Sequence, residues 1–197
     1  MLNDNVIKQI KDYAELNNIP IMTDGGIHFL TNYISKNHVK KVLEIGTAIG
    51  YSAIMMCSVD NDVMVTTIER DEKRYLEAIK NIKKVNLEDR IQLIYNDALD
   101  VKITDYYDLI FIDAAKAQNQ KFFEKFERNL KEDGVIITDN MKFHGLVDKK
   151  VEDISSRNLR QLVRKVKDYT NFLKGNVNYD TEFLEIGDGL AVSKKIS

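Results

Sequence analysis

The sequence has few of the residues that cross-link or interrupt a chain: it holds one cysteine, one proline and no tryptophan among 197 residues. A single thiol forms no internal disulfide, which suits a reducing compartment, and the apolar neighbours of Cys57 favour a packed core thiol over a nucleophile. No apolar run approaches the ~18 residues of a membrane span, and the first residues lack the basic and apolar pattern of a signal peptide. We therefore expect a cytoplasmic protein with no membrane partner.

Neither sign of charge is in large excess, because 29 lysines and arginines face 31 aspartates and glutamates. This balance argues against a surface that binds nucleic acid everywhere, although it leaves room for a local basic face. Hydrophobic residues make up 44% of the chain, enough for one ordinary core. No Gly/Ser-rich linker, internal repeat or low-complexity stretch divides the sequence. Residues 1–197 are predicted to form a single domain.

Helical and strand-like patterns alternate along the chain. Two helical patterns on either side of Pro20 form an entry segment over residues 1–38. Apolar runs at 41–45, 63–68, 91–95, 109–113 and 135–138 then predict strands, and the alternation favours a parallel sheet with right-handed crossovers. The stretch TEFLEIGDGLAVSKK, residues 181–195, predicts a terminal antiparallel hairpin around Gly187-Asp188-Gly189. The predicted fold class is α/β, a three-layer αβα sandwich.

A glycine turn follows the first predicted strand in VLEIGTAIGYS, residues 42–52. Its Gly46-x-x-x-Gly50 spacing matches neither the G-x-G-x-x-G of a dinucleotide fold nor a phosphate-binding P-loop. Glu69 ends the next strand, where an acidic side chain accepts hydrogen bonds from a ribose, although an exposed glutamate without a ligand is the alternative. Because the turn has no Lys or Arg, a neutral or cationic nucleoside such as S-adenosylmethionine fits better than a pyrophosphate.

Oxygen-bearing side chains end two further strands: Asp113 closes LIFID, and Asp139 and Asn140 close VIITDN. Two carboxylates and an amide are hard ligands, which suit Mg²⁺ or another hard divalent cation and do not resemble a zinc site. Their spacing alone equally allows helix N-caps. Lys116 follows Asp113 by three residues, and a divalent cation nearby would favour its neutral, basic form, whereas a lone surface lysine would be inert.

Five motifs together resemble a known family, the S-adenosylmethionine-dependent, divalent-metal-dependent O-methyltransferases of the catechol and caffeoyl-CoA type. The motifs LEIGTAIGYS, TTIERD, NDALD, YDLIFIDAAK and VIITDN occur in the family's order and at its approximate spacing. From NNIPIM through FHGLV to IGDGLAVSKK, the chain is most similar to the bacterial tRNA 5-hydroxyuridine methyltransferases. The resemblance implies a Rossmann-like class I methyltransferase with a mostly parallel seven-stranded sheet, and commonly a homodimer.

The resemblance also implies the role of each matching residue. Glu69 would hold the cofactor's ribose, and Asp97 and Ala98 would flank its adenine. The remaining residues implied to line the cofactor pocket are Met22, Gly46, Ala48, Tyr51 and Ser52, together with Asp113. Asp113, Asp139 and Asn140 would hold Mg²⁺, and the implied catalytic residues are Lys116, as the general base, and Asp113.

A sulfonium methyl is already an activated electrophile, so the protein must mainly place an oxygen nucleophile and make it anionic. The 5-hydroxyl and 4-carbonyl oxygens of 5-hydroxyuridine are vicinal, much like the two oxygens of a catechol. The predicted function is Mg²⁺-dependent methyl transfer to the 5-hydroxyl of 5-hydroxyuridine at the wobble position of the tRNA anticodon, giving 5-methoxyuridine. The alternatives are a small-molecule catechol- or caffeoyl-type O-methyltransferase and a non-catalytic cofactor-binding module.

A basic stripe bears on the choice of acceptor. Arg157, Arg160, Arg164 and Lys167 recur at helical spacing in a helix expected over residues 156–173. A solvated amphipathic helix has such a face without any ligand. Four cations beside the mouth of a site could instead bind the phosphates of a tRNA anticodon loop.

Overall fold

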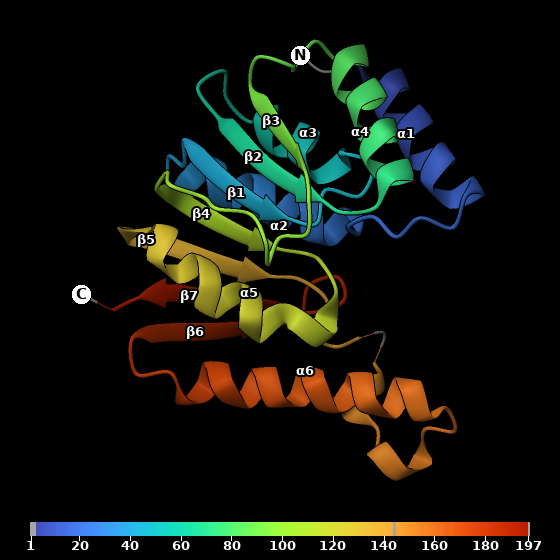
Figure 1. The fold of residues 1–197 in the computed structure, drawn as a ribbon, viewed down its shortest axis with the longest axis vertical. Helices are drawn as coiled ribbons and strands as arrows, with labels where there is room; N and C mark the ends of the chain where they lie inside the picture. The colour runs from blue at the N-terminus through green and yellow to red at the C-terminus, as the bar shows by residue number, and fades with distance from the viewer. Residues whose placement is uncertain (1–2, 144, 197) are drawn as a thin grey trace.

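In the computed structural model, which describes residues 3–143 and 145–196, seven strands form one sheet with the order β3-β2-β1-β4-β5-β7-β6 (Figure 1). β1 to β5 run parallel to one another, and β7 runs antiparallel to β5 and β6. This is the predicted mostly parallel sheet with a terminal antiparallel hairpin. The strands are β1 Lys41–Ile45, β2 Met64–Glu69, β3 Ile91–Tyr95, β4 Tyr107–Ile112, β5 Leu130–Thr138, β6 Tyr179–Leu184 and β7 Leu190–Lys195.

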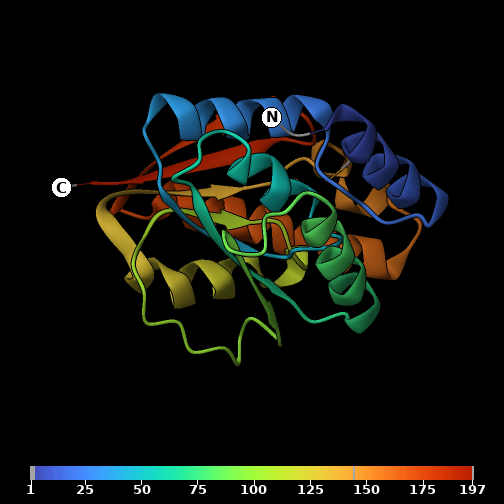
Figure 2. The same ribbon diagram turned by 90° about the horizontal axis from the view of Figure 1, so that it is seen from above.

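Helices cover both faces of the sheet and complete the three-layer sandwich (Figure 2). α1 to α4 pack against one face, and α5 and α6 pack against the other. The α-helices are α1 Asp4–Leu16, α2 Asp24–Lys36, α3 Tyr51–Cys57, α4 Glu72–Lys84, α5 Asn119–Phe126 and α6 Arg157–Gly175, and the 3-10 turns are η1 Lys116–Gln118, η2 Glu127–Asn129, η3 Leu146–Asp148 and η4 Val151–Asp153. Within the described ranges, no helix has the length and apolar character that crossing a bilayer requires.

Side-chain caps set where four of these helices begin. Asn3, Thr23, Asp71 and Ser156 each accept a hydrogen bond from a backbone N–H in the first turn of α1, α2, α4 and α6 respectively. Such caps satisfy donors that have no partner within the helix. The cap at Thr23 places the start of α2 directly beside the candidate site described below.

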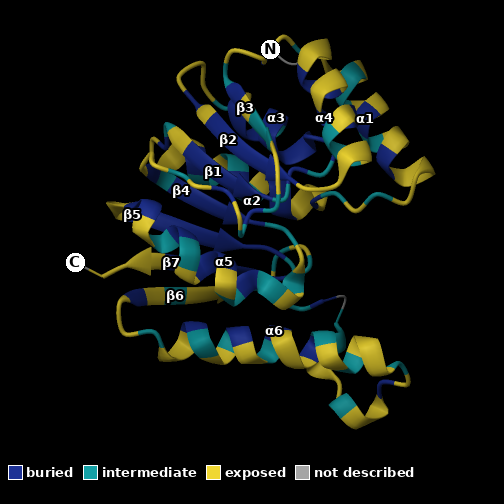
Figure 3. Cartoon of the chain, in the orientation of Figure 1, coloured by how far each residue is buried: buried dark blue, intermediate teal, exposed yellow. Residues whose placement is uncertain are grey.

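β4 shows why the central strands are continuous apolar runs. Leu109 and Phe111 face the core under α1 to α4. Ile110 and Ile112 face α5 and α6, and all four side chains are fully buried. A strand covered on both faces needs apolar residues at every position, so the usual alternation disappears. Figure 3 shows the buried strands between helices whose outer faces are exposed.

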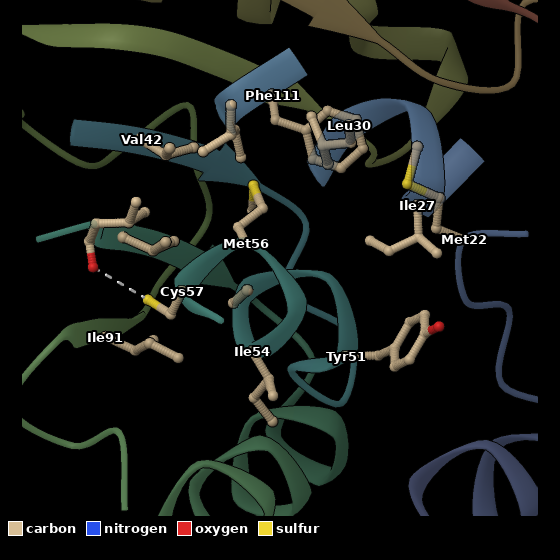
Figure 4. Packing of buried hydrophobic residues seen from close by; sticks show 14 of the residues in the cluster. Met22, Ile27, Leu30, Val42, Tyr51, Ile54, Met56, Cys57, Ile91 and Phe111 are labelled. Atoms are coloured by element: carbon tan, nitrogen blue, oxygen red, sulfur yellow. Dashed lines mark hydrogen bonds between the residues drawn. The ribbon is translucent and has the colours of Figure 1, made fainter. Parts of the chain in front are cut away.

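α3 runs through the larger core cluster, where Met56 and Cys57 are fully buried (Figure 4). The Cys57 thiol donates to the carbonyl oxygen of Val63, with Sγ and oxygen 3.5 Å apart. Burial raises the pKa of Cys57 to about 12, so the reactive thiolate is not available near neutral pH. The prediction of a packed core thiol is confirmed.

Candidate active site

The carboxyl ends of β1, β2, β4 and β5 open onto one cavity of about 330 Å³. The cavity spans β1 and β4, where the strand order reverses and where open α/β sheets bind their ligands. Of the twelve residues predicted from the sequence, nine line this cavity, and Met22, Tyr51 and Ser52 do not. The nine are Gly46, Ala48, Glu69, Asp97, Ala98, Asp113, Lys116, Asp139 and Asn140.

The turn after β1 requires glycine at its first position. Gly46 has a φ of +101°, and a Cβ there would lie 2.1 Å from the carbonyl oxygen of Asp113. On the other side, the amide N–H groups of Gly46 and Thr47 donate to the carbonyl oxygen of Ile68, at N–O distances of 3.0 and 3.3 Å. The turn is thus fixed between the ends of β2 and β4, and Ala48 within it also has a positive φ, of 46°.

Gly46→Ala should lower the free energy of unfolding by more than about 2 kcal/mol, because the strain at positive φ adds to a clash with backbone. It should also weaken binding of S-adenosylhomocysteine. Gly145→Ala is the matched control, since Gly145 also has positive φ, +73°, but has no heavy atom within 4 Å of an added Cβ. Urea unfolding and calorimetry would measure both effects, and equal losses in the two variants would contradict the steric explanation.

Glu69, at the end of β2, is held by three backbone amides. The Ala48 N–H donates to Oε2 at 2.8 Å, and those of Arg70 and Asp71 donate to Oε1 at 2.9 Å. The side chain is 7% exposed and lines the cavity. Its carboxylate therefore has a fixed direction and keeps accepting capacity for a further donor, such as a ribose hydroxyl.

Asp97 lines the same end of the cavity. The Leu99 amide donates to its Oδ1 at 2.9 Å, and Arg70 Nη1 lies 3.1 Å from its Oδ2. These contacts lower the pKa of Asp97, with the backbone bond from Leu99 the larger favourable cause. This carboxyl group is therefore ionised at neutral pH, and it lines the part of the cavity where the adenine of the cofactor was predicted to bind.

Three predicted cofactor residues, Met22, Tyr51 and Ser52, lie outside the cavity lining. Met22 and Tyr51, the first residue of α3, are buried in the core (Figure 4), and Lys11 Nζ lies 5.9 Å from the centre of the Tyr51 ring. The Ser52 hydroxyl donates to the carboxyl group of Glu44. None of these three residues lines the cavity in which the cofactor was predicted to bind.

Glu44 is a fully buried carboxyl group on β1, which the sequence analysis did not single out. Besides the Ser52 bond, it accepts a hydrogen bond from the Thr67 hydroxyl at 2.5 Å. Burial raises the pKa of Glu44 to about 7, and the nearby charges of Asp113 and Glu69 add to this rise. The acid is thus coupled to two residues that line the cavity above it.

Glu44→Gln should make the stability of the fold depend less on pH. Because the pKa of Glu44 rises from 4.5 to about 7 on folding, the folded protein retains a proton that the unfolded chain releases. Wild-type stability is therefore lost as pH rises through this window, by about 3 kcal/mol at most. Gln keeps the shape without the charge, so urea unfolding at several pH values should show the variant gaining on wild type between about pH 4.5 and 7, with a constant difference at higher pH. Parallel pH curves would contradict this.

Asp113 and Asp139 meet at the tips of the paired strands β4 and β5. The Asp113 amide donates to Ile45 O at 3.0 Å and the Asp139 amide donates to Ile112 O at 3.1 Å, so both residues extend the strand register. Burial raises the pKa of Asp113 to about 6 and that of Asp139 to about 7, and the charge of Asp113 adds to the second rise. Among the described residues, neither acid has an ion pair within 4 Å.

Lys116 reaches this cluster from η1. Its Nζ donates to Oδ1 of Asn140 at 2.5 Å and lies 5.5 Å from the centre of the Phe143 ring. Asn140 has a φ of +62°, a strained conformation of the kind found at functional sites. The positive charge of Lys116 opposes the rise in the pKa of both Asp113 and Asp139. The predicted base and the predicted ligands therefore lie together.

These donors fit a hard cation. Two acids with raised pKa values, Asp139 buried and Asp113 partly buried, stand beside an amide oxygen, and such a set of oxygens is what Mg²⁺ accepts. Within the described part of the chain, no three His, Cys, Asp or Glu side chains form a metal-binding group. A cation bound by Asp113 and Asp139 would therefore need the amide oxygen of Asn140 as its third protein ligand. Asp113, Asp139 and Asn140 all line one cavity, and their role as cation ligands stays a prediction.

Asp188 is a cavity residue that the sequence analysis did not assign to the site. It lies in the turn between β6 and β7, where its carbonyl oxygen accepts from the Lys142 amide at 2.8 Å. Its charge contributes to the raised pKa of Asp139. The one local signal was its position between two glycines, which we interpreted only as a hairpin turn.

The basic stripe on α6 is partly used within the fold. Arg160 Nη1 donates to the carbonyl oxygens of Ile154 and Ser155, at 2.6 and 3.1 Å, and Lys167 Nζ donates to that of Lys149 at 3.2 Å. These two cations hold the segment after β5 against α6. Arg157 and Arg164 remain exposed. The stripe is therefore half structural, and two of its four members face solvent.

A Rossmann-like sheet with a glycine turn after β1, an acid at the end of β2 and an oxygen-rich cluster after β4 and β5 is the architecture of a class I methyltransferase. The chain belongs to the O-methyltransferase family, whose model matches residues 2–196. The predicted enzyme class, an S-adenosylmethionine-dependent O-methyltransferase, is thereby confirmed.

Named relatives extend this result. The chain is 27% identical over 194 residues to the caffeoyl-CoA O-methyltransferase of Populus kitakamiensis, covering 94% of this chain and 82% of that protein. A solved Staphylococcus aureus protein, provisionally named a caffeoyl-CoA O-methyltransferase, is 43% identical, with a TM-score of 0.92 over 96% of this chain and 92% of the other. An O-methyltransferase of Bacillus cereus, solved with SAH, has the same fold, with a TM-score of 0.85 at 24% identity over 98% and 92% of the two chains. None of these names mentions tRNA, so the acceptor stays a prediction.

Proposed function

We propose that the enzyme transfers the methyl group of S-adenosylmethionine to one of two vicinal oxygens on its acceptor, with Mg²⁺ or a similar cation held by Asp113, Asp139 and Asn140. The observation that carries this proposal is that these three side chains and Lys116 line one end of a single cavity. Glu69 and Asp97 line the other end, where carboxylates suit the ribose and adenine of the cofactor.

The chain's own side chains divide the work. Asp113 and Asp139 supply negative charge that offsets a divalent cation, and Asn140 supplies a neutral oxygen. Lys116, already beside Asn140, would hold or accept the proton of the acceptor hydroxyl at Nζ. When bound, a hard cation supplies Lewis-acid activation of that hydroxyl and orients it.

Asp139→Ala should abolish methyl transfer and leave cofactor binding largely intact, because Asp139 lies at the cation end of the cavity. Removing divalent cations with EDTA should have the same effect, and added Mg²⁺ should restore turnover in wild type only. Asp133→Ala is the control, since Asp133 is an exposed acid on the same strand. Full turnover by metal-free wild-type protein would contradict the proposed role of the cation.

As the acceptor we propose the 5-hydroxyuridine at the wobble position of a tRNA anticodon, giving 5-methoxyuridine. The sequence motifs favour it, and so does the surface: Lys149, Lys150, Arg157 and Arg164 are exposed on and beside α6, and the described residues give none of them an ion pair. Such cations suit RNA phosphates.

A small phenol with two vicinal hydroxyls is the second candidate, and the relatives' names favour it. They include caffeoyl-CoA O-methyltransferases and a flavonoid 3',5'-methyltransferase from Vitis vinifera, 25% identical over 193 residues. The proposed cation site serves both acceptors, because each presents two neighbouring oxygens. The acceptors differ in how many phosphates they bring to the protein.

The salt dependence of binding separates the two acceptors. Affinity for an anticodon stem-loop carrying 5-hydroxyuridine should fall steeply with salt, and Arg157→Gln or Arg164→Gln should each reduce the log–log slope by about 0.7. Arg128→Gln, which changes an exposed arginine on η2, should leave the slope unchanged. Nucleoside mass spectrometry should show 5-methoxyuridine. Turnover of catechol with none of the RNA would favour the second candidate.

We also propose a homodimer and a cytoplasmic location, as the sequence implies. Sedimentation velocity of the purified protein would show its oligomeric state directly.

A further inference from the structure

The ammonium group of Lys116 contacts one of the three proposed ligands of the candidate cation site. It donates to Oδ1 of Asn140 at 2.5 Å, which is the amide oxygen that the proposed cation would use. The Lys116 side chain lines the cavity together with Asp113 and Asp139. A protonated lysine is a compact positive charge with three donors, so it satisfies an oxygen-rich pocket much as a small cation does.

The Phe143 ring makes a second contact with this ammonium. Nζ lies 5.5 Å from the ring centre, within the range of a cation–π contact. Phe143 is 9% exposed and packs with Ile154 and Val163 in a small cluster under α6. The ring is therefore fixed by packing, and it supports the lysine at Asn140 rather than offering a free face to a stacked base.

We propose that Lys116 competes with the divalent cation: its ammonium occupies the amide oxygen of Asn140, one of the three proposed ligands, and a cation binds only by displacing it. This inference rests on the proposed cation site. Phe143 acts as a positioning residue that favours the lysine-occupied state. Displacement would couple the two roles of the site, since cation binding would release the Lys116 side chain from Asn140 toward the acceptor.

The opposite coupling is the competing physical possibility. Lys116 could instead hold the strained Asn140 in the orientation that a cation needs, in which case its removal would weaken cation binding. The two possibilities therefore predict opposite signs for a single measurement, which needs neither acceptor nor turnover.

Calorimetric titration of the purified full-length protein with Mn²⁺ and with Mg²⁺ makes this test. Lys116→Met removes the charge and keeps most of the volume, and it should tighten binding about tenfold, the order expected for one unit charge a few ångströms away in a partly screened site. Phe143→Leu should tighten binding less. Lys121→Met, which changes an exposed lysine on α5, is the control and should bind as wild type does.

Unchanged or weaker binding by Lys116→Met would overturn the proposal. A wild-type protein that binds neither ion would instead overturn the proposed cation site, so the two failures are distinguishable. If circular dichroism shows that Lys116→Met does not fold, the test is made on the wild-type protein instead, by NMR of ¹³Cε-labelled lysine. Added Mg²⁺ should then shift one lysine signal that is absent from Lys116→Gln, and a spectrum without any shift would count against displacement.

Discussion

The site depends on one close backbone contact, between the turn after β1 and the tip of β4. Gly46 lies so near the carbonyl group of Asp113 that no side chain fits between them, and the Asp113 amide donates back to Ile45. Asp113 is therefore both the wall behind the cofactor turn and the first acid of the oxygen cluster. The two ends of the cavity share this residue, so their separation is set by strand pairing and not by flexible loops.

Most of the architecture could be predicted because it follows from local pattern. Strands buried on both faces give continuous apolar runs, and the acids directly after them were visible as Glu69, Asp113 and Asp139. Boundaries were less predictable. β5 begins at Leu130, before the expected residue 135, because Leu130 pairs with Tyr107 across a register shift in β4. Such pairing is a property of two distant segments and leaves no local signal.

The parts of the site that sequence reasoning missed come from long-range packing. Asp188 reaches the cavity because β7 returns beside β5. The side chains of Tyr51 and Ser52 face away from the cavity, because the first turn of α3 presents them to the core and to Glu44. Arg160 on the basic stripe is occupied by backbone carbonyl groups of the folded segment before α6. A charge pattern shows where cations recur and does not show which of them the fold uses.

The balance of charge around the cavity explains what kind of ligand it favours. Among the described residues that line it, five are acidic and three are basic, and Glu44 adds a further acid beneath the turn. Burial is the main cause of the raised pKa values of Asp113 and Asp139, and the charges of Asp113 and Asp188 add to the rise at Asp139. Such a site favours positively charged partners, and the sulfonium of the methyl donor carries a positive charge that the product thioether lacks. Methyl transfer therefore removes one source of the cofactor's attraction to the cavity. The acids that favour binding of the sulfonium donor thus also favour replacement of the thioether product by a new donor molecule.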